Sequence, residues 1–161
     1  MGRSVRSETR SRTAVISTAV GYPWVRFATF IMPLRVHYAG DIVLIVDPDG
    51  LQADAAELCE QQRVAVTPFR GNVTCGKVQC PGLVVARFHQ IAELCAPYEL
   101  CLATDMRDVI FQADPFATLL RPIGHAADLV LSCEDPAKSI GSSFFNAAWA
   151  KKCFGADFLR R

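Results

Sequence analysis

The chain has 161 residues, of which 51% are hydrophobic and 20% charged, and its formal net charge is +1. This composition suits one globular domain with a sizeable core and excludes a disordered chain. The balanced charge argues against a general nucleic-acid binder, which would show a basic face or tail. No window approaches ~18 uninterrupted apolar residues, so the sequence predicts no membrane span.

The first twelve residues form a basic, serine-rich segment. Its arginines are Arg3, Arg6, Arg10 and Arg12. We interpret residues 1–12 as a flexible, solvated arm and expect the folded part to span residues 13–161. The remnant of a targeting peptide is the less favoured alternative, because the segment has no apolar core of the kind that such peptides carry.

Apolar runs and helical patterns alternate along the rest of the chain. The sequence predicts strands at residues 13–20, 42–46, 64–69, 100–104 and 128–133, and helices at 24–38, 51–62 and 83–95. We expect the first helix to be kinked or interrupted at Pro33, and the third to begin near Val85. Residues 72–82 read as a loop. The order predicts an α/β fold: a mostly parallel sheet with helices on both faces, in which ligands bind beyond the carboxyl ends of the strands.

The seven cysteines give no clear redox compartment. They are Cys59, Cys75, Cys80, Cys95, Cys101, Cys133 and Cys153. An odd number cannot be fully paired within one chain. Cys75 and Cys80 flank a glycine-containing loop and could form a local disulfide. A zinc site there is the weaker alternative, because no histidine or second cysteine pair lies nearby.

Two acidic stretches follow predicted strands, and the first reads IVDPDG. Asp47 and Asp49 superficially resemble the nucleophile motif of haloacid-dehalogenase-like phosphatases. That family places the motif on its first strand, whereas residues 13–20 come earlier here, and its later lysine has no good match. We favour a β-turn at residues 48–50, because proline, aspartate and glycine are all common in turns.

The second stretch reads ATDMRDVIFQADPF. Carboxylates at a strand end are suited to hold a hard divalent cation, so Asp105 and Asp108 are candidate metal ligands. They would share a face if the chain turned helically after Thr104. Arg107 could pair with a phosphate or with one of the carboxylates. The structural alternative is that Asp105 caps a short helix while Asp108 pairs with Arg107. Asp114 reads mainly as a cap before a proline.

The block D-x-R-D-V-x-F-Q-x-D-P-F resembles the signature of a group of GT-A-type glycosyltransferase-like proteins of plants, algae and other eukaryotes. Its flanks agree: Arg87-Phe88 and residues 98–100 precede the block, and residues 129–135, Asn146, Trp149 and residues 153–155 follow it. The resemblance covers roughly residues 83–161 well. It covers the first half only in the order of strands and helices.

The resemblance implies a Rossmann-like nucleotide-diphospho-sugar transferase fold that binds a nucleotide-sugar donor with Mn²⁺ or Mg²⁺. Carried over by position, Asp105 would contact ribose, sugar or metal, Asp108 the metal, and Arg107 would orient the pair. Ser17 and Thr18 would lie near the nucleotide, although a plain strand end is an equal alternative. By position Arg87 would reach a phosphate, and an ordinary surface arginine is the equal alternative.

GT-A domains are usually longer, and their acceptor site and catalytic base come from a later half. We therefore expect residues 13–161 to be the donor-binding part of such a domain: a fragment, a truncated gene model or a divergent short form. No catalytic base is assigned, and His37, His89 and His125 match no metal ligand. The function expected is a metal-dependent glycosyltransferase donor domain with an unknown acceptor. The alternative is a non-catalytic or truncated module of the same fold. The resemblance suggests the Golgi lumen or a Golgi membrane association.

Overall fold

The computed structural model describes residues 12–71, 74–75, 78–79, 83–117, 142–144, 147–148, 151 and 155. The chain divides into two compact units, residues 1–72 with 81–122 and residues 73–80 with 123–161. The predictions for residues 1–11 and 128–135, and those for Cys80, His125, Asn146, Trp149 and Cys153, lie outside the described residues. None of the helices within the described ranges is long and apolar enough to cross a membrane.

The first unit is built on a four-stranded, all-parallel sheet. Its strands are β1 (Thr13–Thr18), β2 (Asp41–Val46), β3 (Val64–Pro68) and β6 (Leu100–Asp105), in the order β3-β2-β1-β6. The two central strands, β1 and β2, are buried along almost their whole length. A strand covered on both faces needs apolar residues at every position, which is why both read as continuous apolar runs. The predicted parallel sheet is confirmed.

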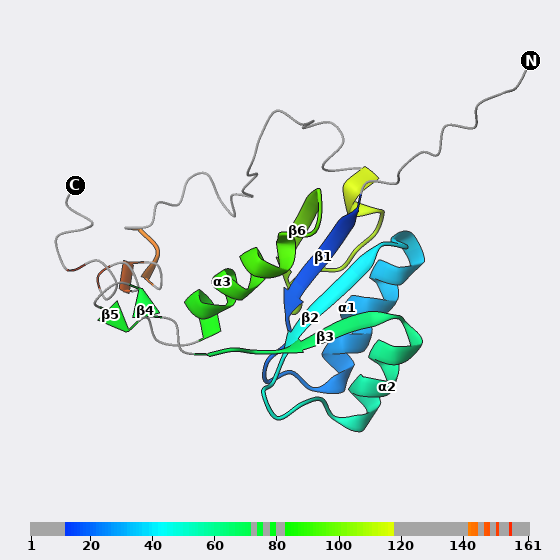
Figure 1. Ribbon diagram of the computed structural model, residues 1–161, viewed down its shortest axis with the longest axis horizontal. Helices are drawn as coiled ribbons and strands as arrows, with labels where there is room; N and C mark the ends of the chain where they lie inside the picture. The colour runs from blue at the N-terminus through cyan, green and yellow to red at the C-terminus, as the bar shows by residue number, and fades with distance from the viewer. Residues whose placement is uncertain are drawn as a thin grey trace, which may run out of the picture. The chain divides into compact units, whose positions relative to one another are not determined.

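Three helices cover this sheet, and they lie on both of its faces (Figure 1). They are α1 (Trp24–His37), α2 (Ala53–Gln61) and α3 (Leu83–Cys95). One core cluster joins α1 and α2 to residues such as Val15 and Leu44, and the other joins α3 to Ala14 and Ile16. α1 continues through Pro33 rather than ending there. α3 begins two residues earlier than the sequence suggested.

One arginine ties the helical layer together at the end of α1. The guanidinium of Arg35 donates hydrogen bonds to the carbonyl oxygens of Tyr38, Gly40, Gln62 and Arg63, over distances of 2.6 to 3.2 Å. Two of these acceptors lie just beyond the end of α2. A charged donor for carbonyls that no helix bond satisfies stabilises both helix ends. The partial burial that this requires lowers the pKa of Arg35.

The segment that follows β6 is anchored in the α1 side of the core by Met106, Phe111 and Phe116, each buried. The Phe111 ring meets Phe30 of α1 edge to face, with centroids 5.5 Å apart, and the Phe116 ring lies 5.2 Å from that of Tyr38. Burying side chains of this size contributes about 1.5–3 kcal/mol each. The apolar residues of the acidic stretch therefore fix its path, and its charged residues stay at the surface.

The second unit contains a two-stranded antiparallel ladder, β4 (Thr74–Cys75) and β5 (Val78–Gln79). The sequence predicted only a loop for residues 72–82. Strands of two residues are too short to show an alternating pattern, so the signal was absent from the sequence.

The strand order creates a reversal between β1 and β6. The chain moves outward from β1 to β2 and β3, then returns through α3 to the opposite side of β1. In open parallel sheets the crevice at such a topological switch point, beyond the carboxyl ends of the strands, is where ligands bind. Here that position lies beside Thr18 and Asp105, which are paired across the two strands.

Candidate functional site

The floor of the candidate site is the paired end of β1 and β6. Ser17 lies opposite Thr104 in the register, and its hydroxyl donates a 2.7 Å hydrogen bond to the Thr104 carbonyl oxygen. The side chain of Ser17 is completely buried. Ser17 therefore links the ends of β1 and β6 by a buried hydrogen bond, and its side chain is not accessible to solvent.

Thr18, one residue further, occupies the end of β1 beside Asp105. Alternation along the strand puts its side chain on the same face as Ala14 and Ile16, the face that α3 covers. Thr18 is only 5% exposed, and its Oγ1 has no hydrogen-bond partner among the described residues. A buried hydroxyl without a partner costs free energy and needs an explanation, such as a ligand or water that completes it.

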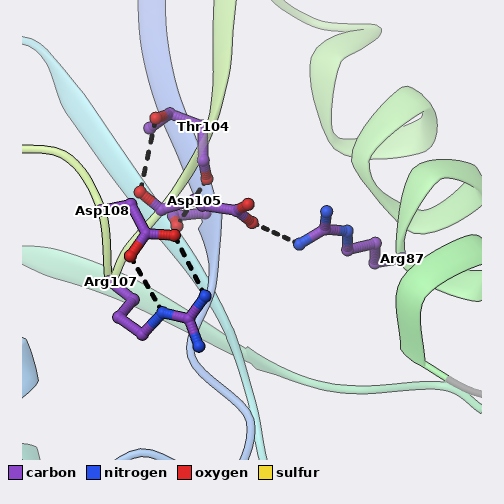
Figure 2. A network of polar contacts seen from close by, with 6 residues as sticks. Arg87, Thr104, Asp105, Arg107 and Asp108 are labelled. Carbon is purple, nitrogen blue, oxygen red and sulfur yellow. Dashed lines mark hydrogen bonds and ion pairs between the residues drawn. The ribbon is translucent and has the colours of Figure 1, made fainter. Parts of the chain in front are cut away.

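Arg87 reaches this strand end from α3. Its Nη1 donates to Oδ1 of Asp105, and Figure 2 shows the carboxylate of Asp105 pointing toward α3. The side chain of Arg87 is 22% exposed and that of Asp105 is 50% exposed. The ring of Phe88 lies 5.0 Å from the guanidinium carbon, and the Arg87 Nε is buried without a partner in the described part of the chain. The structure thus joins two residues that the sequence singled out separately.

Asp108 and Arg107 form a second ion pair nearby. The Nε and Nη2 atoms of Arg107 donate to the two carboxylate oxygens of Asp108 over 2.9 and 3.2 Å (Figure 2). The hydrogen bonds from Arg107 hold the pKa of Asp108 below its usual value, and the positive charge of Arg26 acts in the same direction. This confirms the pairing of Asp108 with Arg107 that the structural interpretation of the stretch predicted.

The path of residues 106–108 differs from one expectation. These residues form bends rather than a helical turn, so Asp105 caps no helix there and the two acids do not share a helix face. Met106 between the two acids is buried, and the acids face different arginines. Asp114 does act as a cap: its Oδ1 accepts from the backbone N–H of Phe116 at 2.8 Å and of Ala117 at 3.3 Å.

The earlier acidic stretch, after β2, forms the turn that the sequence predicted. The N–H of Gly50 donates to the carbonyl oxygen of Asp47 at 3.0 Å, and Gly50 has a φ of +98°. The carboxylate of Asp47 also accepts a 2.9 Å hydrogen bond from the N–H of Gly21, in the loop after β1. Sequence reasoning missed this link, because it joins two loops 26 residues apart.

A hollow of about 300 Å³ lies between the same two loops. Its lining combines the loop after β1, the turn after β2 and the inner side of two helices; the residues are Gly21, Tyr22, Pro23, Phe27, Asp47, Gly50, Leu51, Gln52 and Ala55. Both loops leave the carboxyl edge of the sheet, as does the acidic stretch after β6. A ligand at this edge therefore has room beside Asp47.

The donor set after β6 suits a divalent cation in its chemistry. Asp105 and Asp108 offer carboxylate oxygens, and both side chains are at least half exposed. No group of three or more His, Cys, Asp or Glu side chains gathers within the described ranges. Mg²⁺ bound with a nucleotide commonly takes only one or two carboxylates, and phosphate oxygens and water complete its shell. In the structure each of the two acids accepts hydrogen bonds from an arginine.

The remaining metal-binding residue types lie elsewhere. His37 on α1 and His89 on α3 are exposed. Cys59, Cys95 and Cys101 are free thiols. The pairing of Cys75 with Cys80 stays a prediction, because Cys80 lies outside the described residues.

Comparison with known proteins identifies no family for this chain. The chain matches no family model, and no curated protein matches it.

Proposed function

We propose that the first unit is the donor-binding part of a metal-dependent glycosyltransferase, which takes a sugar from a nucleotide-sugar. The observation that carries the proposal is the placement of the D-x-R-D-V-x-F-Q-x-D-P-F block at the switch point of the sheet. There its Asp105 lies beside Thr18, whose buried hydroxyl has no partner among the described residues. The strand order β3-β2-β1-β6 supports the proposal, because ligands of Rossmann-like folds bind at this crevice.

In this proposal the two arginines change partners when the donor binds. A diphosphate attracts guanidinium groups strongly and bidentately, so it competes with Asp108 for Arg107 and with Asp105 for Arg87. The ion pair of Arg107 and Asp108 is exposed, at 59% and 60%, and exposed pairs contribute little to stability. Opening it therefore costs little. Thr18 would accept or donate one hydrogen bond to the donor.

The cation would bind to Asp105 and Asp108 in this scheme, as Mn²⁺ or Mg²⁺. When bound, it offsets the negative charge that develops on the leaving nucleotide diphosphate. The hollow beside Asp47 would leave room for the nucleoside at the same edge of the sheet. We further propose a glycan, protein or small molecule as acceptor, and a Golgi location; both rest on the resemblance alone.

The alternative is a module of the same fold that binds or supports without catalysis. One observation favours it: both acids already have arginine partners, so the stretch is complete as a pair of ion pairs. A turnover assay on the purified chain with a panel of acceptor sugars separates the two, because turnover excludes the non-catalytic module.

The first experiment is calorimetry of UDP-sugar and GDP-sugar binding to the full chain, with Mn²⁺ and then with EDTA. We expect binding that requires the cation and that falls at least tenfold in Asp108→Ala, about 1.4 kcal/mol or more. The matched control is Glu60→Gln, an exposed acid on α2, which should bind as the wild type does. Metal-independent binding that Asp108→Ala leaves unchanged would refute the proposal. So would no binding by a wild-type chain that melts cooperatively.

A further inference from the structure

Two cysteines lie at the other end of the contact between α3 and β6. Cys95 is the last residue of α3, and Cys101 is the second residue of β6. The Sγ of Cys101 lies 3.8 Å from the carbonyl oxygen of Cys95. Both side chains are free thiols, both are partly buried, and both pack against the core cluster that contains Ala14 and Ile16.

The pKa of Cys101 is sensitive to Cys95. Burial raises the pKa of Cys101 to about 12, and hydrogen bonding with Cys95 and the charge of Cys95 are the further causes. Cys59 differs: burial alone raises its pKa to about 11, and it packs in the opposite core cluster. Among the free thiols in the described residues, Cys95 and Cys101 therefore form a pair, whereas Cys59 stands apart.

We propose that Cys95 and Cys101 form a reversible disulfide that ties the C-terminal end of α3 to β6. The two elements are already joined near the carboxyl edge of the sheet by Arg87 and Asp105. A disulfide between Cys95 and Cys101 would fix the C-terminal end of α3 to the beginning of β6. The proposal does not depend on glycosyltransferase activity, because it concerns only the packing of one helix on one strand.

The chemistry is thiol–disulfide exchange with a small-molecule disulfide such as oxidised glutathione. The Cys95 thiolate attacks one sulfur of glutathione disulfide, which forms a mixed disulfide and releases one glutathione. The Cys101 thiolate then attacks the Cys95 sulfur, closes the protein disulfide and releases the second glutathione. Two electrons pass from the protein thiols to the oxidant, and each thiol proton ends on a released glutathione.

The raised pKa of Cys101 makes ring closure slow at neutral pH, because the thiolate is the attacking species. Closure should accelerate as pH rises. Within the described residues, Tyr98 is a further titratable group beside Cys101, and it interacts in turn with Arg12 and Asp41. Arg12 also lies 5.2 Å above the Tyr98 ring, measured from its guanidinium carbon.

Peptide mapping of the full wild-type chain tests the proposal directly. Trypsin cleaves after Arg87 and Arg107, and no lysine or arginine lies between them, so one peptide carries both cysteines. After oxidation and alkylation, we expect this peptide to lack both alkyl groups and to be lighter than the reduced peptide by two hydrogen atoms. A second cleavage after Tyr98 should separate the reduced peptide into two pieces and leave the oxidised one joined. Dithiothreitol should restore alkylation.

A thermal melt gives an independent measurement. Closing this short loop restricts the unfolded chain, so we expect oxidation to raise Tm by about 5 °C. Cys95→Ala and Cys101→Ala should each abolish the shift. The matched control Cys59→Ala should keep the shift, even if its starting Tm falls.

Two results would overturn the proposal. One is a peptide in which both cysteines remain alkylated after oxidation, and the other is linkage of either cysteine to a different cysteine. Peptide mapping uses only the wild type, so a variant that fails to fold leaves the test intact.

Discussion

The loop after β2 and the segment after β6 both place acids at the carboxyl edge of one sheet. The acids of the two segments accept hydrogen bonds from different kinds of donor. After β2, the carboxylate of Asp47 accepts from the backbone N–H of Gly21 and so fixes the neighbouring loop. After β6, Asp105 and Asp108 hold arginine side chains. A backbone donor is held in place by the loop itself, whereas an arginine side chain can exchange one anion for another. The first acid is therefore structural, and the other two can be displaced.

The largest expected effect is a loss of stability in Asp47→Ala. Removing the carboxylate leaves the Gly21 N–H without its acceptor, in a loop where Gly21 has a φ of +78°. We expect the free energy of unfolding to fall by about 1.5 kcal/mol, measured by urea denaturation. Asp49→Ala in the same turn is the matched control and should change stability by less than ~0.5 kcal/mol. Equal losses in both variants would show that the hydrogen bond is not what distinguishes Asp47.

A smaller effect, of opposite sign, should appear at Thr18. Its hydroxyl is buried without a partner among the described residues, and valine has nearly the same shape. We expect Thr18→Val to raise the free energy of unfolding by about 1 kcal/mol, because it removes an unsatisfied polar group. Under the proposed function it should also weaken nucleotide-sugar binding in calorimetry. A residue that costs stability and aids binding is typical of a site.

Ser17→Ala is the control for that variant, because Ser17 precedes Thr18 and its hydroxyl has a partner, the Thr104 carbonyl oxygen. It should lower stability instead of raising it. A Thr18→Val chain that is less stable than the wild type would mean that the hydroxyl has a partner after all.

Much of the sheet could be predicted from the sequence, because a strand that is buried on both faces reads as a continuous apolar run. The runs that became β1 and β2 are buried along almost their whole length, and their ends were predicted to within two residues. The turn at residues 48–50 was also predicted, since proline, aspartate and glycine each favour it locally. These features depend on short stretches of chain.

The contacts of the candidate site depend on distant residues, so the sequence could name its members without pairing them. Arg87 and Asp105 are 18 residues apart, and their ion pair requires a particular placement of α3 on the sheet. The sequence left open whether the chain turns helically after Thr104. The structure has bends at residues 106–108 and buries Met106, which local charge spacing does not report. The ladder of β4 and β5 was missed because each strand has two residues.

The smallest expected effect concerns the titration of Asp108. Hydrogen bonds from Arg107 lower its pKa, so the pair contributes stability above the unfolded-state pKa of roughly 3.9, and this is lost as pH falls through the lower folded pKa. We expect Arg107→Gln to raise the pKa of Asp108 toward its usual value, measured from its carboxylate carbon by NMR. High salt should act in the same direction, because the pair is exposed.

An unchanged pKa in Arg107→Gln would mean that Arg107 does not hold the carboxylate in solution. The same spectra sharpen the contrast with Asp47. If the acids after β6 are displaceable, Mg²⁺ with a nucleotide diphosphate should shift the carboxylate resonances of Asp105 and Asp108. A shift confined to the Asp47 resonance would instead indicate that the ligand binds in the hollow beside the turn after β2. Because Arg107 can leave Asp108 at little cost, whereas Gly21 loses its only described acceptor without Asp47, we expect the response at the segment after β6.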